Sequence, residues 1–106
     1  TKHGFRIVHA DRLSLPQQAV LFRNTHYLAG IHGAGMTNMI FRKDYVMSML
    51  EIFPPQPVIP YHYAVLAHTY DYRYQAMQGA PGKSKYSGGF IVDPEKLDQM
   101  LGIITE

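Results

Sequence analysis

The sequence predicts an α/β fold in three layers, with a mostly parallel sheet covered by helices on both faces. Strand-like and helix-like segments alternate along the 106 residues. Two short apolar runs lack the polar alternation of half-exposed strands, which is typical of strands buried on both faces. Two helix starts carry capping side chains. The expected order is β-α-β-α-β-α-β-β-α, and successive strands joined by helices pair in parallel.

The first quarter of the chain contains a predicted strand and a predicted helix. Residues 5–8 (FRIV) favour a strand. A helix is expected over roughly residues 15–24, because Ser14 and Gln17 have the spacing of a capping box. A proline in the first turn agrees with this start, and Asn24 is a suitable left-handed stop. The apolar stripe of this helix comprises Leu15, Ala19 and Phe22, with Val20 beside them.

The middle of the chain contains two predicted buried strands with a short helix between them. Tyr27–Ile31 is one continuous apolar run. Residues 46–53 form the second, which two prolines end. The short helix is expected over residues 36–41.

The last part of the chain contains two helices, two strands and a loop. Residues 61–70 are expected to form a helix, and the alternation in residues 72–77 predicts a half-exposed strand. Residues 78–89 form a loop rich in Gly, Lys and Ser, and residues 90–92 a short strand. Asp93 caps a final helix with proline in its first position. The buried stripe of that helix is expected to comprise Leu97, Met100, Leu101 and Ile104.

Composition limits the classes of protein to which the chain can belong. A length of 106 residues corresponds to a single domain, residues 1–106. Charged residues make up only 17%, against about 25% in typical soluble proteins, which suggests that part of the surface is covered by another domain or chain. The net charge of +2 is too small to argue for nucleic-acid binding. The absence of cysteine excludes disulfides and thiolate metal sites within these residues.

A glycine-containing turn carries the strongest chemical signal. Residues 32–35 (HGAG) follow a predicted buried strand and open a helix, where unpaired N–H groups attract anions. Ligands in parallel sheets bind at the carboxyl ends of the strands, which places the candidate turns at residues 9–14, 32–36, 53–60 and 77–89. The HGAG turn lacks the lysine of a P-loop and the third glycine of a dinucleotide fingerprint. A phosphate or diphosphate fits it, and the alternative is that the glycines only permit tight helix–strand packing.

Three segments together resemble glycosyltransferase family 61, which includes bacterial capsule-synthesis proteins and eukaryotic O-GlcNAc and xylosyl transferases. They are residues 32–41 (HGAGMTNMIF), residues 50–54 (LEIFP) and residues 13–22 (LSLPQQAVLF). The resemblance covers about residues 12–104 and is strongest at 32–41. Residues 42–45 depart from it, because the family usually has a turn with proline or glycine there.

The resemblance implies a specific architecture and reaction. It implies a Rossmann-like domain that forms the C-terminal half of a GT-B enzyme and binds a nucleotide-sugar donor, with UDP as the expected nucleotide. Transfer would be inverting and would need no metal ion or other cofactor. The expected partners are an N-terminal acceptor-binding domain, outside these residues, and a glycan or protein acceptor, with no nucleic acid. The expected location is the bacterial cytoplasm or inner-membrane surface, or the secretory-pathway lumen in a eukaryote.

The candidate site residues lie in and beside the HGAG turn. His32 is the catalytic candidate; it could hydrogen-bond the diphosphate or brace the turn, and the alternative is a core histidine bonded to a backbone carbonyl. Asn38 could contact a phosphate or cap a neighbouring loop. Glu51 interrupts an apolar strand and needs a partner, since an unpaired buried carboxylate is costly. That partner could be ribose hydroxyls, or else an arginine or backbone N–H groups. The expected substrate-binding residues are His32, Gly33, Ala34, Gly35, Met36, Thr37, Asn38 and Glu51.

Other side chains are weaker candidates. Arg6 and Arg12 could neutralise phosphate, and Lys83 and Lys85 could lie on a lid, but such side chains are usually solvated. The tyrosines between 61 and 74 favour packing, with uracil stacking as an alternative for one of them. The remaining histidines lack metal-ligand spacing.

Two other functions compete with sugar transfer. The first is a non-catalytic α/β nucleotide-binding or interaction module that keeps the anion-binding turn. The second is a hydrolase, because HGAG resembles an esterase oxyanion turn, but the Gly-x-Ser-x-Gly nucleophile motif is absent from the sequence.

Overall fold

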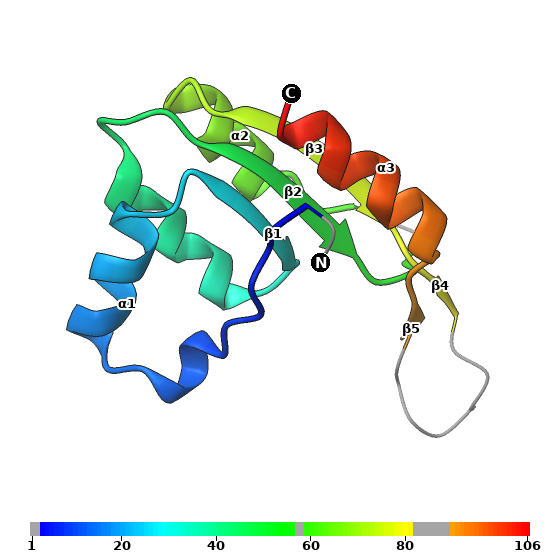
Figure 1. Ribbon diagram of the computed structural model, residues 1–106, viewed down its shortest axis with the longest axis horizontal. Coiled ribbons are helices and arrows are strands. Elements are labelled where there is room, and N and C mark those ends of the chain that lie inside the picture. The colour runs from blue at the N-terminus through cyan, green and yellow to red at the C-terminus, as the bar shows by residue number, and fades with distance from the viewer. Residues whose placement is uncertain (1–2, 57–58, 82–89) are drawn as a thin grey trace.

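The computed structural model describes residues 3–56, 59–81 and 90–106. Figure 1 shows helices and strands alternating along most of the chain. The helices and strands are η1 (Ala10–Arg12), α1 (Leu15–Arg23), β1 (Tyr27–Ile31), η2 (Ala34–Arg42), β2 (Ser48–Phe53), α2 (His62–Thr69), β3 (Arg73–Gln78), β4 (Ala80–Pro81), β5 (Phe90–Ile91) and α3 (Pro94–Ile104), where η marks a 3-10 helix.

The central sheet has three parallel strands in the order β1-β2-β3. Gly30 of β1 is the register partner of Glu51 of β2, which in turn is paired with Ala76 of β3. The carboxyl ends of all three strands therefore lie at the same edge of the sheet. The short strands β4 and β5 form a separate antiparallel pair.

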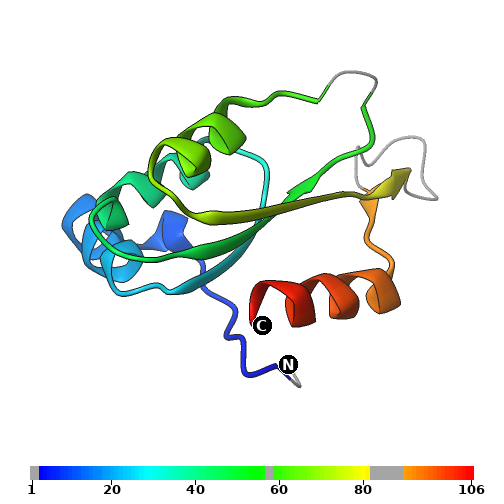
Figure 2. The ribbon, with the colours of Figure 1, turned by 90° about the horizontal axis from the view of Figure 1, so that it is seen from above.

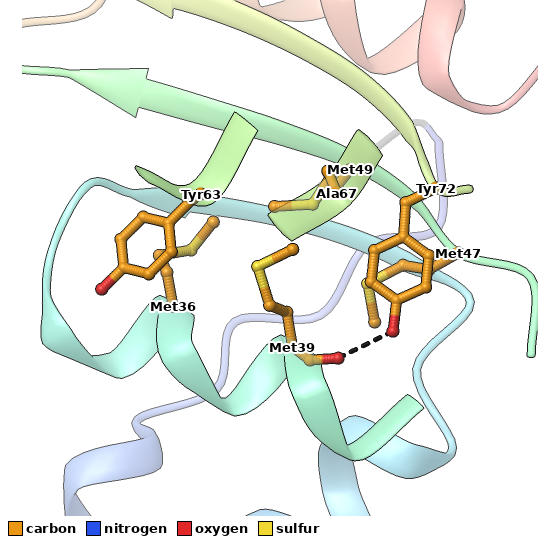
Figure 3. Close-up of a cluster of buried hydrophobic side chains, with 7 residues drawn as sticks. All are labelled: Met36, Met39, Met47, Met49, Tyr63, Ala67 and Tyr72. Carbon is orange, nitrogen blue, oxygen red and sulfur yellow. Dashed lines mark hydrogen bonds between the residues drawn. The ribbon is translucent and has the colours of Figure 1, made fainter. Parts of the chain in front are cut away.

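Helices cover both faces of the sheet, as Figure 2 shows. On one face, η2 and α2 enclose a methionine- and tyrosine-rich cluster, drawn in Figure 3. On the other face, α3 packs against Leu50, Ile52 and Met77 of the sheet. Strand β2 is buried along its whole length, because it lies between two strands and under helices on both sides. The predicted three-layer α/β fold with a parallel sheet is confirmed, and the structure is compatible with a Rossmann-like domain.

The predicted start of α1 is confirmed, and two details of the helix differ from the prediction. The N–H of Ser14 donates to Oε1 of Gln17 at 2.9 Å, and the N–H of Gln17 donates to Oγ of Ser14 at 3.3 Å, which completes a capping box. Asn24 ends the helix with φ −96°, so it is not a left-handed stop. Its side chain instead donates to the carbonyl of Val20. Of the predicted apolar stripe only Phe22 is buried, because the helix packs on η2 along a narrow face.

Residues 5–8 do not form the predicted strand. His3 bonds Asp98 of α3 at 2.8 Å, and Phe5 packs against the cluster under α3. These two residues contact α3 and its cluster, whereas Arg6 and Val8 line a cavity beside α1 and β1, and Ile7 is 87% exposed. As a result, the predicted ligand turn at residues 9–14 does not follow a strand.

The C-terminal elements also differ in part from the prediction. β3 begins and ends one residue later than expected, at Arg73–Gln78. Strand β5 pairs with β4 instead of joining the main sheet, and β4 occupies part of the segment expected to be a loop. Asp93 caps α3 as predicted, through its carboxylate and the N–H of Glu95 at 3.0 Å. Lys83 and Lys85 lie outside the described residues.

Candidate functional site

The HGAG turn lies where β1 passes into η2, at the carboxyl edge of the sheet. The backbone N–H of His32 donates to the carbonyl of Ile52 at 2.8 Å and so continues the sheet for one residue. The N–H of Met36 donates to the carbonyl of Gly33 at 3.0 Å, which closes the first turn of the helix. The N–H groups ahead of Met36 have no acceptor within the helix. The turn therefore presents backbone donors at the edge where ligands bind in parallel sheets.

The space around each glycine near the turn shows whether that glycine is needed for packing or leaves room for a ligand. Gly33 has φ 173°, an extended conformation open to any residue. A Cβ on Gly33 would meet nothing closer than 3.8 Å, and a Cβ on Gly35 would meet nothing within 4 Å. A Cβ on Gly30 would lie 2.8 Å from Sδ of Met36. Tight helix–strand packing thus depends on Gly30, whereas Gly33 and Gly35 border open space.

Side chains on the covered face hold the turn in place. Met36 and Met39 are buried beneath η2 and anchor it to the sheet, as Figure 3 shows. The hydroxyl of Tyr63, on α2, donates to the carbonyl of Gly33 at 2.7 Å and lies 3.0 Å from Oγ1 of Thr37. The turn is therefore braced from the inside by a second helix.

Glu51 has two side-chain partners and no exposed surface. Oε2 lies 2.5 Å from Nδ1 of His32, and Oε1 accepts a hydrogen bond from the hydroxyl of Tyr74 at 2.5 Å. His32 directly follows β1 and Tyr74 lies in β3, so the two strands that flank β2 place both partners diagonally across from Glu51. Among the described residues, no arginine and no set of backbone N–H groups satisfies this carboxylate, although the sequence had suggested both as partners.

Burial and the carboxylate of Glu51 both raise the pKa of the Tyr74 hydroxyl. The pKa of this hydroxyl lies well above its ordinary value. Desolvation is the largest cause, followed by the hydrogen bond to Glu51 and the charge of Glu51. The hydroxyl therefore keeps its proton and donates a hydrogen bond to Oε1. This interaction was not predicted, because the register between β2 and β3 cannot be seen in the sequence.

The ring of His32 is enclosed by aromatic side chains and keeps some exposure. It stacks on Phe53 with ring centroids 5.2 Å apart, and it lies 5.1 Å from His62 and 5.3 Å from Tyr63. Its side chain is 19% exposed. His32 is therefore held by side chains, and its Nδ1 faces Glu51 instead of the backbone carbonyl considered from sequence.

The remaining predicted residues are distributed around this edge. Nδ2 of Asn38 donates to Oε1 of Gln18 at 2.8 Å, and Gln18 in turn donates to the carbonyls of Ala10 and Leu13. Asn38 thus ties η2 to the segment that precedes α1, as its loop-capping alternative proposed. Arg6 and Arg12 are exposed, and neither belongs to the network around Glu51.

A cavity beside β1 lies away from the HGAG turn. It encloses about 520 Å³ between the N-terminal segment, the end of α1 and β1, and none of its lining residues belongs to the turn. Within the described residues, no group of three or more His, Cys, Asp or Glu side chains is placed to hold a metal ion. No helix in the described part of the chain is long and apolar enough to span a bilayer.

Comparison with known proteins found a family model that matches the first part of the chain. The model of the family described as Glycosyltransferase 61 matches residues 1–52. No match was found among curated proteins or among solved structures. The resemblance is thus confirmed as far as Ile52, and its extension to residue 104 stays a prediction. Residues 1–52, which include the HGAG turn and the buried Glu51, match the family model, and this partial match supports membership of glycosyltransferase family 61.

Proposed function

We propose that this chain binds the nucleotide-sugar donor of an inverting glycosyltransferase that makes polysaccharide or other glycans. The match to the family 61 model over residues 1–52 supports sugar transfer as the activity. The parallel sheet and the placement of the turn at its carboxyl edge support donor binding as the role of this domain. The acceptor, a glycan or a protein, would be held by a second, N-terminal domain of a GT-B enzyme.

The open turn at Gly33–Gly35 is the observation that carries this proposal. Among the described residues, no atom lies closer than 3.8 Å to a Cβ built on Gly33 or within 4 Å of one built on Gly35, so a ligand can approach the backbone closely. The N–H groups at the start of η2 would receive the diphosphate, since a helix N-terminus favours anions. Met36 and Thr37 contribute through their backbone, and their positions are set by burial of Met36 and by the contact of Thr37 with Tyr63.

Stabilising the leaving diphosphate is the chemical task that the turn would perform. When the sugar is transferred, the bond between its anomeric carbon and the phosphate oxygen breaks, and negative charge develops on the diphosphate. Fixed backbone donors stabilise that charge in the transition state. We propose that transfer proceeds without a metal ion and that the chain alone binds UDP but transfers no sugar.

Titration of the ¹⁵N-labelled chain with UDP, followed by amide chemical shifts, tests this proposal. The largest shifts are expected between Gly33 and Asn38. Gly35→Ala should weaken UDP binding about tenfold or more, because its methyl group occupies the space that the diphosphate needs. Gly102→Ala is the matched control, since it also adds a methyl group to a helix without a close contact. Gly102→Ala should bind UDP as the unsubstituted chain does.

Two results would contradict the proposal. One is a titration in which the amides of the turn do not shift at millimolar UDP. The other is a Gly35→Ala variant that binds UDP as tightly as Gly102→Ala does. If UDP binds at the turn but the full-length protein transfers no sugar, a non-catalytic nucleotide-binding module would be the better assignment.

A further inference from the structure

We propose that Glu51 and Tyr74 are positioning residues that present Nε2 of His32 to the bound diphosphate, and that His32 takes up a proton from solvent when the nucleotide binds. This inference rests on the proposed diphosphate site at the HGAG turn. It assigns a role to Tyr74, which lies outside the part of the chain matched to the family. It also predicts a measurable link between nucleotide binding and protonation.

The hydrogen bonds to Glu51 determine which nitrogen of His32 faces inward. A fully buried carboxylate needs a donor at each oxygen, and Tyr74 supplies one of them at Oε1. Oε2 must then receive its hydrogen bond from Nδ1 of His32, 2.5 Å away. Nδ1 therefore carries a proton, and in the neutral ring Nε2 has none.

The opposite edge of the ring is the one a ligand can reach. Nδ1 faces a carboxylate with no exposed surface, so the 19% exposure of the side chain belongs to the rest of the ring. Among the described residues, every buried side-chain nitrogen or oxygen has a partner, and no described residue provides one for Nε2. Nε2 is therefore accessible. Gly33 follows directly in the chain, which places the ring beside the proposed diphosphate.

The charges around His32 explain why His32 should take up a proton when the nucleotide binds. The titratable groups that face it are Glu51 from β2, His62 and Tyr63 from α2 and, through Glu51, Tyr74 from β3. None of these described contacts is a lysine or an arginine. An unprotonated Nε2 would present a lone pair to a phosphate oxygen. A protonated Nε2 instead donates a hydrogen bond, and the ring cation lies between the carboxylate and the diphosphate.

Calorimetric titration with UDP in two buffers of different ionisation enthalpy measures the protons taken up. Above the second phosphate pKa of about 6, UDP contributes little itself. The unsubstituted chain should take up a substantial fraction of one proton per UDP, and affinity should fall as the pH is raised. His32→Gln should show no such uptake. Glu51→Gln should lose most of the proton uptake. It should also bind UDP about tenfold more weakly, because the hydrogen bond from the protonated His32 ring to the diphosphate is lost. Tyr74→Phe should reduce the uptake in part.

A second readout follows His32 itself. In the unsubstituted chain without ligand, the long-range ¹H–¹⁵N spectrum of the ring should show the proton on Nδ1. Glu51→Gln should give a mixture of tautomers, since an amide can either donate or accept. His62→Gln is the control for the neighbouring histidine, and it should keep both the proton uptake and the tautomer.

The outcomes separate this inference from the function on which it rests. If UDP does not bind at the turn, the proposed function fails and this inference fails with it. If UDP binds there but proton uptake equals that of His32→Gln, only the inference is overturned. It is also overturned if the ring of the ligand-free chain carries its proton on Nε2, or if Tyr74→Phe and Glu51→Gln both leave proton uptake unchanged.

Discussion

Three glycines at one edge of the sheet have different roles. Gly30 is needed for packing, because a Cβ there would lie 2.8 Å from Sδ of Met36. Gly33 and Gly35 meet no such obstacle. From the sequence alone the three glycines cannot be distinguished, since each is a small residue near the end of a strand. Only the position of the buried Met36 side chain distinguishes the packing glycine from the two that border the proposed ligand site.

Replacing Gly30 tests this division of roles. We expect Gly30→Ala to lower the free energy of unfolding by about 1–3 kcal/mol, because Met36 must move within a packed cluster. Gly35→Ala is the matched substitution, and it should leave stability unchanged or raise it, since alanine favours helix. Urea unfolding of both variants gives the comparison. Equal stability of the two would contradict the assignment of packing to Gly30.

Glu51 shows how far residue-level reasoning extends. Its place in an apolar strand predicted a buried carboxylate in need of partners, and the structure has it fully buried. The identity of the partners was not predictable. His32 lies 19 residues earlier in the chain and Tyr74 lies 23 residues later, and both reach Glu51 only through the sheet register.

Helix α1 illustrates the reliability of local signals. Its capping box involves residues three positions apart, so the interaction forms wherever the helix forms. The predicted left-handed stop at Asn24 was wrong, because its side chain bonds back to the helix while the backbone keeps a negative φ.

Loss of the cap on α1 should be measurable in stability. We expect Ser14→Ala to lower the free energy of unfolding by about 1 kcal/mol, since the N–H of Gln17 loses its acceptor. Thr69→Ala is a useful comparison, because that exposed threonine lies at the end of a helix and caps no N-terminus. Chemical denaturation measures both. A Ser14→Ala variant no less stable than Thr69→Ala would contradict the capping role.

At the scale of the whole molecule, β2 connects two separate cores. Met47 and Met49 face η2 and α2, whereas Leu50 and Ile52 face α3. Tyr72 links the layers on the first face, because its buried hydroxyl donates to the carbonyl of Met39 in η2 at 2.8 Å, as drawn in Figure 3. Burial, followed by the charge of Tyr70, raises the pKa of Tyr72 to about 12.

The raised pKa of Tyr72 predicts a loss of stability at high pH. The folded state favours the neutral hydroxyl, so its contribution is complete below the unfolded pKa of about 10 and is lost as the pH rises towards about 12. Urea unfolding across this range should show that Tyr72→Phe falls less steeply than the unsubstituted chain. Tyr45→Phe, at an exposed position, should not change the slope. Equal slopes for all three proteins would contradict the prediction.

The sequence by itself determined the positions of β1 and β2, the starts of α1 and α3, and the turn at His32–Gly35. These features depend on residues close together in the chain, such as a capping pair or a continuous apolar run. The expectation that β1 is buried on both faces was wrong, because β1 lies at the end of the strand order and is exposed at Tyr27 and Ile31. Only the tertiary structure decided that His3 and Phe5 contact α3 and its cluster, that β5 pairs with β4, and that His32 and Tyr74 meet at Glu51. The physical reason is that each of these depends on which distant segments become neighbours, and on the register between them, and neither is determined by local patterns of residue type.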